Sequence, residues 1–78
     1  MEAGRVEAMK YAVVIEKGPG SWGAYVPDLP GCVAAGETRA EVYDLIRGAI
    51  ELHLEQLRDS GEPIPSPQTE ADYVEVGS

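Results

Sequence analysis

Few side chains in this sequence could do nucleophilic or metal chemistry: one cysteine, one histidine and 14 acidic residues. Cys32 is the only thiol, so it can form neither an internal disulfide nor a two-cysteine metal or redox motif. A cysteine nucleophile needs a neighbouring base, and His53 falls late in a predicted helix that begins beside the strand of Cys32. We therefore expect Cys32 to pack in the core.

His53 lies in the apolar face of the predicted helix, where no cysteine, histidine or carboxylate stands three or four positions away to share a metal ion. Gln56 is within reach, but an amide is a poor metal ligand. The pattern favours a core or interface histidine with one hydrogen bond. A pH-sensitive interface is the alternative, because an imidazole changes charge near neutral pH.

Carboxylates fall on the first strand, the helix and the last predicted strand, at Glu16, at Glu41 or Asp44, and at Glu75. Such a set could hold Mg²⁺ for phosphoryl transfer, which makes a Mg²⁺-dependent nuclease one alternative function. Ordinary outward-facing charge accounts for the same residues, and we favour it. The sequence therefore predicts no enzyme and no catalytic, cofactor-binding or metal-binding residue.

Trp22, Tyr25, Asp28 and Leu29 cluster around a predicted strand and the bend that follows it. Trp22 and Tyr25 stand three positions apart, so they point to opposite faces of a sheet. One of them must lie on the face that a single helix cannot cover, where an aromatic side chain favours contact with another protein. Core packing of Trp22 with turn chemistry for the others is the alternative.

These residues must be positioned by short strands that precede one long helix. Tyr11, Val13 and Ile15 fall on one face of a strand predicted over residues 10–16, and the turn sequence of residues 17–21 follows it. Two further strands are predicted, an antiparallel one over residues 22–26 and a short one over residues 32–35, separated by a proline-rich bend at residues 27–31.

A helix is predicted from Arg39 to Ser60, with a length of about 33 Å at 1.5 Å per residue. Thr38 and Glu41 form a capping box at its start, and Gly61 is a typical residue for its end. A helix of this length must overhang strands of seven residues, which reach about 23 Å.

The apolar face of this helix spans roughly 200° when residues are placed at 100° intervals, whereas packing on one sheet needs a stripe of about 100°. The sequence therefore predicts that one flank of the helix meets a second chain, giving a dimer or tetramer. The predicted partner or oligomer interface comprises Trp22, Tyr25, Asp28, Leu29, Leu52, His53 and Gln56.

Beyond the helix, three prolines in residues 62–67 predict an extended arm, and Tyr73 to Val76 predict a last strand. A helix between two strands of one sheet usually makes a right-handed crossover, so this strand is expected to lie parallel to the first. The predicted class is α+β with the order β-β-β-α-β. Residues 1–8 are predicted as a flexible extension, residues 9–76 as one domain and residues 77–78 as a tail.

The chain has 78 residues and a net charge of -8, so it has room for one small core that self-association or a partner would help to stabilise. Its acidity argues against direct binding to nucleic acid or anionic lipid, which relies on Lys and Arg, and leaves basic proteins as partners. It carries neither a secretory leader nor an apolar run of about 20 residues, so we expect a cytoplasmic protein.

Four segments together resemble the HicB antitoxin family over residues 9–76. They are Met-Lys-Tyr at residues 9–11, Tyr-Val-Pro-Asp-Leu-Pro-Gly-Cys at residues 25–32, Ala-Gly-Glu-Thr-Arg-Ala-Glu at residues 35–41, and Gly-Glu-Pro-Ile-Pro at residues 61–65. The resemblance implies a partial ribonuclease-H-like fold. It also implies the antitoxin half of a type II toxin–antitoxin pair, which binds and masks a small, basic, mRNA-cleaving toxin of the HicA type.

Many members of this family carry a C-terminal DNA-binding segment, whereas only Gly77 and Ser78 follow Val76 here, so we expect no DNA-binding domain. The complete ribonuclease-H fold has acidic metal ligands, which this sequence matches only loosely. The resemblance therefore favours a protein-binding module over a nuclease. An oligomeric scaffold or regulator without a toxin is the remaining alternative.

Overall fold

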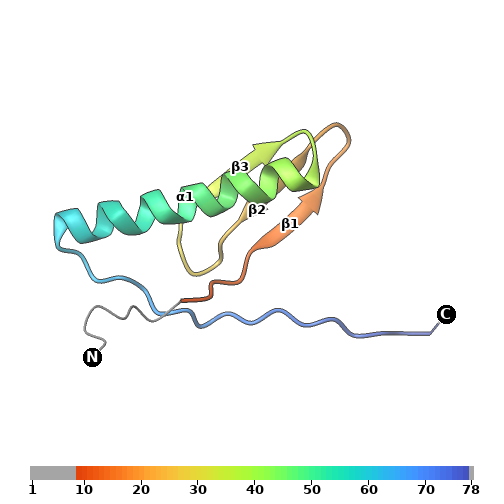
Figure 1. The fold of residues 1–78 in the computed structure, drawn as a ribbon. Coiled ribbons are helices and arrows are strands. Elements are labelled where there is room, and N and C mark those ends of the chain that lie inside the picture. The colour runs from red at the N-terminus through yellow and green to blue at the C-terminus, as the bar shows by residue number, and fades with distance from the viewer. Residues whose placement is uncertain (1–8, 78) are drawn as a thin grey trace, which may run out of the picture.

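The computed structural model describes residues 9–77, which form a three-stranded sheet and one long helix (Figure 1). The strands pair in the order β1-β2-β3, each antiparallel to its neighbour, so the predicted meander and α+β class are confirmed. The extension predicted at residues 1–8 and the last residue of the predicted tail lie outside the described residues. The elements are β1 (Val14–Lys17), β2 (Trp22–Tyr25), β3 (Val33–Gly36) and α1 (Arg39–Ser60).

β1 begins four residues later than the predicted strand, at Val14. Pairing with β2 stops where Val14 faces Tyr25, and the Val26 N–H beyond it donates toward β3, to the Cys32 carbonyl. The next residue, Pro27, has no N–H to donate to a strand beside β2. Residues 9–13 therefore form a lead-in segment that pairs with no strand of the described residues, although Tyr11 within it still packs against the core as the alternation predicted.

Both ends of α1 fall at the predicted residues. The Thr38 hydroxyl accepts a hydrogen bond of 3.0 Å from the Glu41 N–H, which confirms the N-cap. The Glu41 carboxylate accepts from the N–H of Glu37, one residue before the cap, whereas the carboxylate of a capping box accepts from the N–H of the cap residue itself. Gly61 takes the left-handed conformation with φ of 74°, and its N–H donates to the Arg58 carbonyl.

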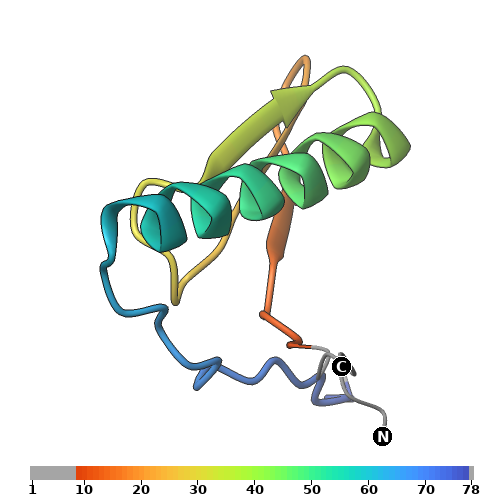
Figure 2. The same ribbon diagram turned by 60° about the vertical axis from the view of Figure 1, so that its left-hand side comes forward.

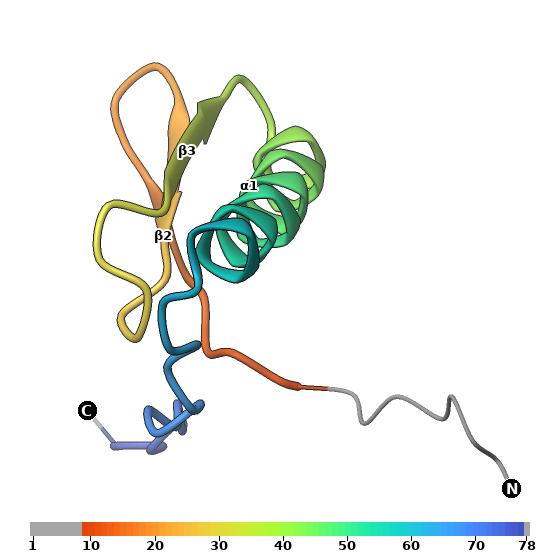
Figure 3. The same ribbon diagram turned by 90° about the vertical axis from the view of Figure 1, so that its left-hand side faces the viewer.

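The helix covers one face of the sheet and leaves the other face open (Figure 3). Alternation places Ile15, Ala24 and Ala34, which lie side by side in the strand register, against the helix. The last turns of α1 extend beyond the sheet, so the predicted overhang is confirmed (Figures 1 and 2). The six buried apolar residues of the core are Ala24, Val26, Leu29, Cys32, Val42 and Ile46.

Residues 62–77 form an extended arm below the sheet (Figures 1 and 3). The structure corrects the prediction of a last strand parallel to β1, because no fourth strand occurs within residues 9–77. The physical reason is the course of the arm: the Tyr11 hydroxyl bonds the Pro65 carbonyl and Asp28 binds Thr69, which leads the end of the arm away from β1. In the part of the chain that the structure describes, no helix has both the length and the apolar character needed to cross a membrane.

Candidate protein interface

The two aromatic residues of the second strand lie on opposite faces, as their spacing predicted. Trp22 packs against the core on the helix side, with the Lys17 ammonium 6.0 Å from its ring. Tyr25 is 42% exposed on the open face, between Val14 of β1 and Val33 of β3 in the strand register. An apolar row therefore crosses the uncovered face of the sheet.

Leu29 has no exposed surface and is one of the three most deeply buried side chains of the core. It sits in the bend after β2, whose backbone is held by hydrogen bonds from the Leu29 N–H to the Val26 carbonyl and from the Cys32 N–H to the Leu29 carbonyl. Its burial removes Leu29 from the predicted interface, because its side chain cannot reach a partner.

Asp28 anchors the arm. One carboxylate oxygen accepts from the backbone N–H groups of Gln68 and Thr69 at 2.8 and 2.9 Å, and the other accepts from the Thr69 hydroxyl at 2.8 Å. These hydrogen bonds, first of all the one from the Thr69 N–H, hold the pKa of Asp28 below its usual value. The sequence placed Asp28 in an interface but did not reveal that its partner is the same chain, 41 residues further on.

The three helical residues of the predicted interface come together beside β3. Leu52, His53 and Gln56 line a hollow of about 160 Å³ whose opposite wall is formed by the start of β3, including Val33. Leu52 is 56% and Val33 64% exposed. Sequence reasoning missed Val33, although its position next to Tyr25 in an antiparallel pair was a usable signal. The β3-edge surface comprises Tyr25, Val33, Leu52, His53 and Gln56.

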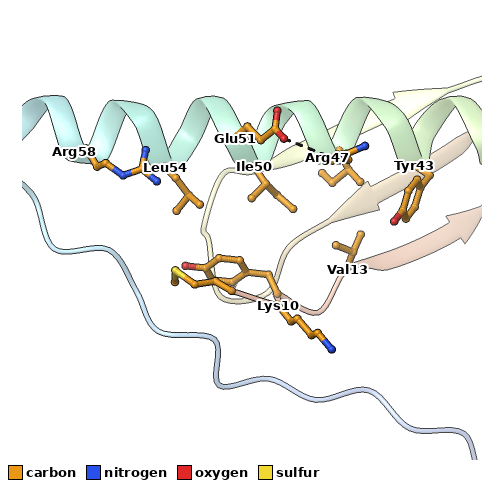
Figure 4. A pocket seen from close by; sticks show the side chains of 11 residues that line it. Lys10, Val13, Tyr43, Arg47, Ile50, Glu51, Leu54 and Arg58 are labelled. Carbon is orange, nitrogen blue, oxygen red and sulfur yellow. Dashed lines mark ion pairs between the residues drawn. The ribbon is translucent and has the colours of Figure 1, made fainter. Parts of the chain in front are cut away.

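A second hollow, the β1-side groove, lies along the opposite flank of α1 and has a volume of about 660 Å³ (Figure 4). Lys10, Arg47 and Arg58 lie along this groove, and the guanidinium of Arg47 is 3.9 Å from the Glu51 carboxylate. Sequence reasoning missed this groove, because its lead-in wall was predicted as part of a paired strand. Its apolar lining comprises Met9, Tyr11, Val13, Tyr43, Ile46, Ile50 and Leu54.

The residues considered for chemistry lie apart or are buried. Cys32 is only 4% exposed, which confirms its predicted place in the core, and burial raises the pKa of its thiol. Within residues 9–77, no three His, Cys, Asp or Glu side chains come close enough to hold a metal ion. Glu41 caps the helix and Glu75 is exposed on the arm, so the carboxylates considered for Mg²⁺ have separate surroundings.

Comparison with known proteins assigns the chain to a family. The family model described as HicB-like antitoxin of bacterial toxin–antitoxin systems matches residues 11–76. A UPF0150 protein of Thermoplasma acidophilum is 40% identical over 63 residues, which cover 80% of this chain and 91% of that protein. Antitoxin HicB 2 of Photorhabdus laumondii is 29% identical over 69 residues, which cover 87% of this chain and 50% of that protein.

The fold also has a counterpart among solved structures. A chain in the structure of a HicA3 and HicB3 toxin–antitoxin complex superposes with a TM-score of 0.65 and 35% identity, covering 77% of this chain and 70% of that one. An uncharacterised protein of Haemophilus phage HP1 is 33% identical over 66 residues, and this chain spans half its length, as it does for antitoxin HicB 2. The meander, the long helix and the match over residues 11–76 together show that the chain belongs to the HicB-like antitoxin family.

Proposed function

We propose that this chain is an antitoxin that binds and neutralises a small, basic, mRNA-cleaving toxin of the HicA type in the cytoplasm. The observation that carries the proposal is the 35% identity and TM-score of 0.65 to a chain of the HicA3 and HicB3 complex. Family membership implies a non-enzymatic role, so the chemistry of inhibition is that of a protein contact. The net charge of -8 supports a basic partner, because opposite charge speeds the encounter.

The toxin contact in this proposal is the β3-edge surface. Among the strands that the structure describes, β3 lies at the edge of the sheet, and an unpaired edge offers backbone N–H and C=O groups to a strand of a partner. Val33 and Leu52 supply exposed apolar area on either side of the hollow, and Tyr25 continues it onto the open face. Glu55, close to Leu52 in a neighbouring hollow, adds negative charge at the border of this surface.

Self-association is the second part of the proposal. α1 exposes large apolar side chains on both flanks: Tyr43 is 51%, Leu45 46% and Leu52 56% exposed. The described core has only six buried residues, so burying further apolar side chains between copies would help to stabilise the fold. We therefore expect a homo-oligomer in solution.

The antitoxin role is tested by co-expression with a HicA-type toxin encoded by the neighbouring gene. We expect the wild-type chain to restore growth and to co-purify with the toxin. Leu52→Glu and Val33→Asp are expected to abolish both effects, because they place a charge in an apolar contact while changing side chains that the fold leaves exposed.

Ala40→Glu is the matched control, since it adds the same charge at an exposed position in the first turn of α1, outside the β3-edge surface. It should restore growth as the wild type does. Failure of the wild-type chain to bind or to suppress this toxin would overturn the antitoxin role, whereas equal rescue by Leu52→Glu and Val33→Asp would overturn only the choice of surface.

A further inference from the structure

The β1-side groove gathers positive charge in an acidic protein. The chain has six Lys and Arg residues, and three of them, Lys10, Arg47 and Arg58, line this groove together with one carboxylate, that of Glu51, which lies 3.9 Å from Arg47. The Lys10 side chain points away from α1 (Figure 4). Its apolar lining includes Tyr43, which is 51% exposed, and Ile50. In the described part of the chain β1 has no strand on its outer side, so the groove adjoins a free sheet edge. These features suit an extended segment with apolar side chains and negative charge.

The end of the arm has these properties. Tyr73, Val74 and Val76 are 93%, 82% and 79% exposed, and they are large apolar side chains in an extended backbone. Glu70, Asp72 and Glu75 supply the negative charge of the same segment. These residues have the composition of a β-strand, yet their apolar side chains face water. Exposed apolar patches of this kind mark contact sites with another molecule.

The arm does not reach the groove of its own chain in this structure. Every residue that lines the groove belongs to the lead-in segment or to α1, and Figure 4 shows the ribbon of the arm passing outside it. The Asp28 carboxylate holds Gln68 and Thr69, and the Tyr11 hydroxyl holds Pro65, so the arm is tied down just before its apolar end.

We propose that residues 72–76 of one copy occupy the β1-side groove of a second copy and add a strand to the free edge beside β1. The exchange is reciprocal, so each copy gives one arm and receives one, and the contact closes as a dimer with two-fold symmetry. The proposal names a contact for the self-association inferred above, and it leaves the β3-edge surface on the other flank of α1 free for a toxin.

Cysteine cross-linking between different copies tests the occupant directly. One preparation carries Val74→Cys, the other carries Tyr43→Cys, and the two are mixed, allowed to exchange and oxidised. We expect a disulfide-linked heterodimer of twice the chain mass. Native Cys32 is buried and burial raises the pKa of its thiol, so it contributes little thiolate to the reaction.

The matched control replaces Tyr43→Cys with Leu45→Cys, because Leu45 is exposed to a similar extent but lies on the other flank of α1. This pair should not cross-link above the background of the unmodified chain. A chain that carries both Val74→Cys and Tyr43→Cys tests whether the arm occupies the groove of its own chain instead. A disulfide formed only within one chain, with no heterodimer in the mixture, would show this and would overturn the exchange.

Solution mass gives an independent measurement. Val74→Asp is expected to weaken dimerisation about a hundredfold, because a symmetric dimer loses two apolar contacts. The fold should survive, since Val74 is 82% exposed. A Val74→Asp chain that dimerises as strongly as the wild type would overturn arm exchange but not self-association. A wild-type chain that is a monomer at all accessible concentrations would overturn both. Neither result bears on growth rescue by the antitoxin.

Discussion

Asp28 shows how one carboxylate can hold together segments that are distant in sequence. It lies in the bend after β2 and accepts three hydrogen bonds from Gln68 and Thr69 of the arm. Burial, and to a smaller extent the negative charge of Asp28, raise the pKa of Tyr11, whose hydroxyl donates a hydrogen bond to the Pro65 carbonyl of the arm. The two residues form one attachment, and the charged form of Asp28 is the form that the arm's N–H groups stabilise.

The attachment of the arm should depend on pH. Because the pKa of Asp28 is lowered in the folded protein, its contribution is fully present above the usual carboxyl pKa and is lost as the pH falls through the lowered value. In an NMR titration between about pH 2 and pH 7, the amide shifts of Gln68 and Thr69 should follow the Asp28 carboxyl, with a midpoint below that of an ordinary aspartate.

Asp28→Ala should remove this titration and move both amides toward their values in an unattached chain, whereas Asp44→Ala, on the exposed face of α1, should leave them unchanged. A midpoint at the ordinary aspartate value, or unchanged amide shifts in Asp28→Ala, would contradict the assigned hydrogen bonds.

At the scale of elements, α1 was predictable from sequence at both ends, whereas the ends of the strands were not. Thr38 and Gly61 act on the chain within a few residues of themselves, so their types suffice to place the ends of a helix. The start of β1 depends on where β2 stops pairing with it, at the contact of Val14 with Tyr25 on the other strand, just before Pro27. Alternation alone carries no information about such a partner.

The difference between local and distant contacts also explains why the last strand was predicted wrongly and why the candidate site was predicted only in part. Tyr73 to Val76 have the composition of a strand, but the contact of Asp28 with Thr69 decides where they lie, and no local pattern encodes it. The wide apolar arc did locate Leu52 and Gln56 on an exposed flank, because helix geometry is regular. Leu29 was predicted to lie in the interface because a bend that contains prolines is typical of the protein surface, but its side chain is buried in the core.

The junction between β3 and α1 is tightly packed around Gly36. A Cβ at Gly36 would lie 3.1 Å from the Glu41 carboxylate and 3.2 Å from the backbone nitrogen of Val42. The carboxylate could move, but the helical backbone cannot, and the carboxylate belongs to the cap. Gly36→Ala should therefore lower the free energy of unfolding by about 1–2 kcal/mol.

Gly48→Ala is the matched control, because no atom lies within 4 Å of its added Cβ and it occupies an exposed position within α1. It should raise the free energy of unfolding by about 0.5–1 kcal/mol through helix propensity. Urea unfolding at one fixed protein concentration measures both, since self-association would make stability depend on concentration. Equal effects of the two substitutions would show that the junction is looser than described.

At the scale of the whole molecule, the shape is elongated and the charges are unevenly distributed. The extents are 51 × 28 × 22 Å and the radius of gyration is 15.1 Å, whereas a compact domain of this size has about 11 Å. The overhanging end of α1 and the arm make the molecule long (Figure 1). Half of its six basic residues line one groove, so the rest of the surface is more uniformly acidic than the net charge of -8 suggests.

The proposed toxin complex should therefore form more slowly as salt is added. Between about 50 and 500 mM salt, the association rate measured by stopped-flow fluorescence should fall roughly tenfold, because ions screen the attraction between an acidic and a basic protein. Glu55→Gln, beside the β3-edge surface, should lower the association rate at low salt and change the dissociation rate little. An association rate independent of salt would contradict electrostatic steering.

The attachments of the arm also fix an order of folding events. The hairpins and the helix close through near neighbours, whereas Tyr11 and Pro65 are 54 residues apart and Asp28 and Thr69 are 41 residues apart. Long loops close after short ones, because closing a longer loop costs more conformational entropy before its contacts can form. During synthesis, the meander and α1 leave the ribosome before the arm does. Each new chain therefore completes its sheet and helix first, and only then can its last residues meet either their own loop or another molecule.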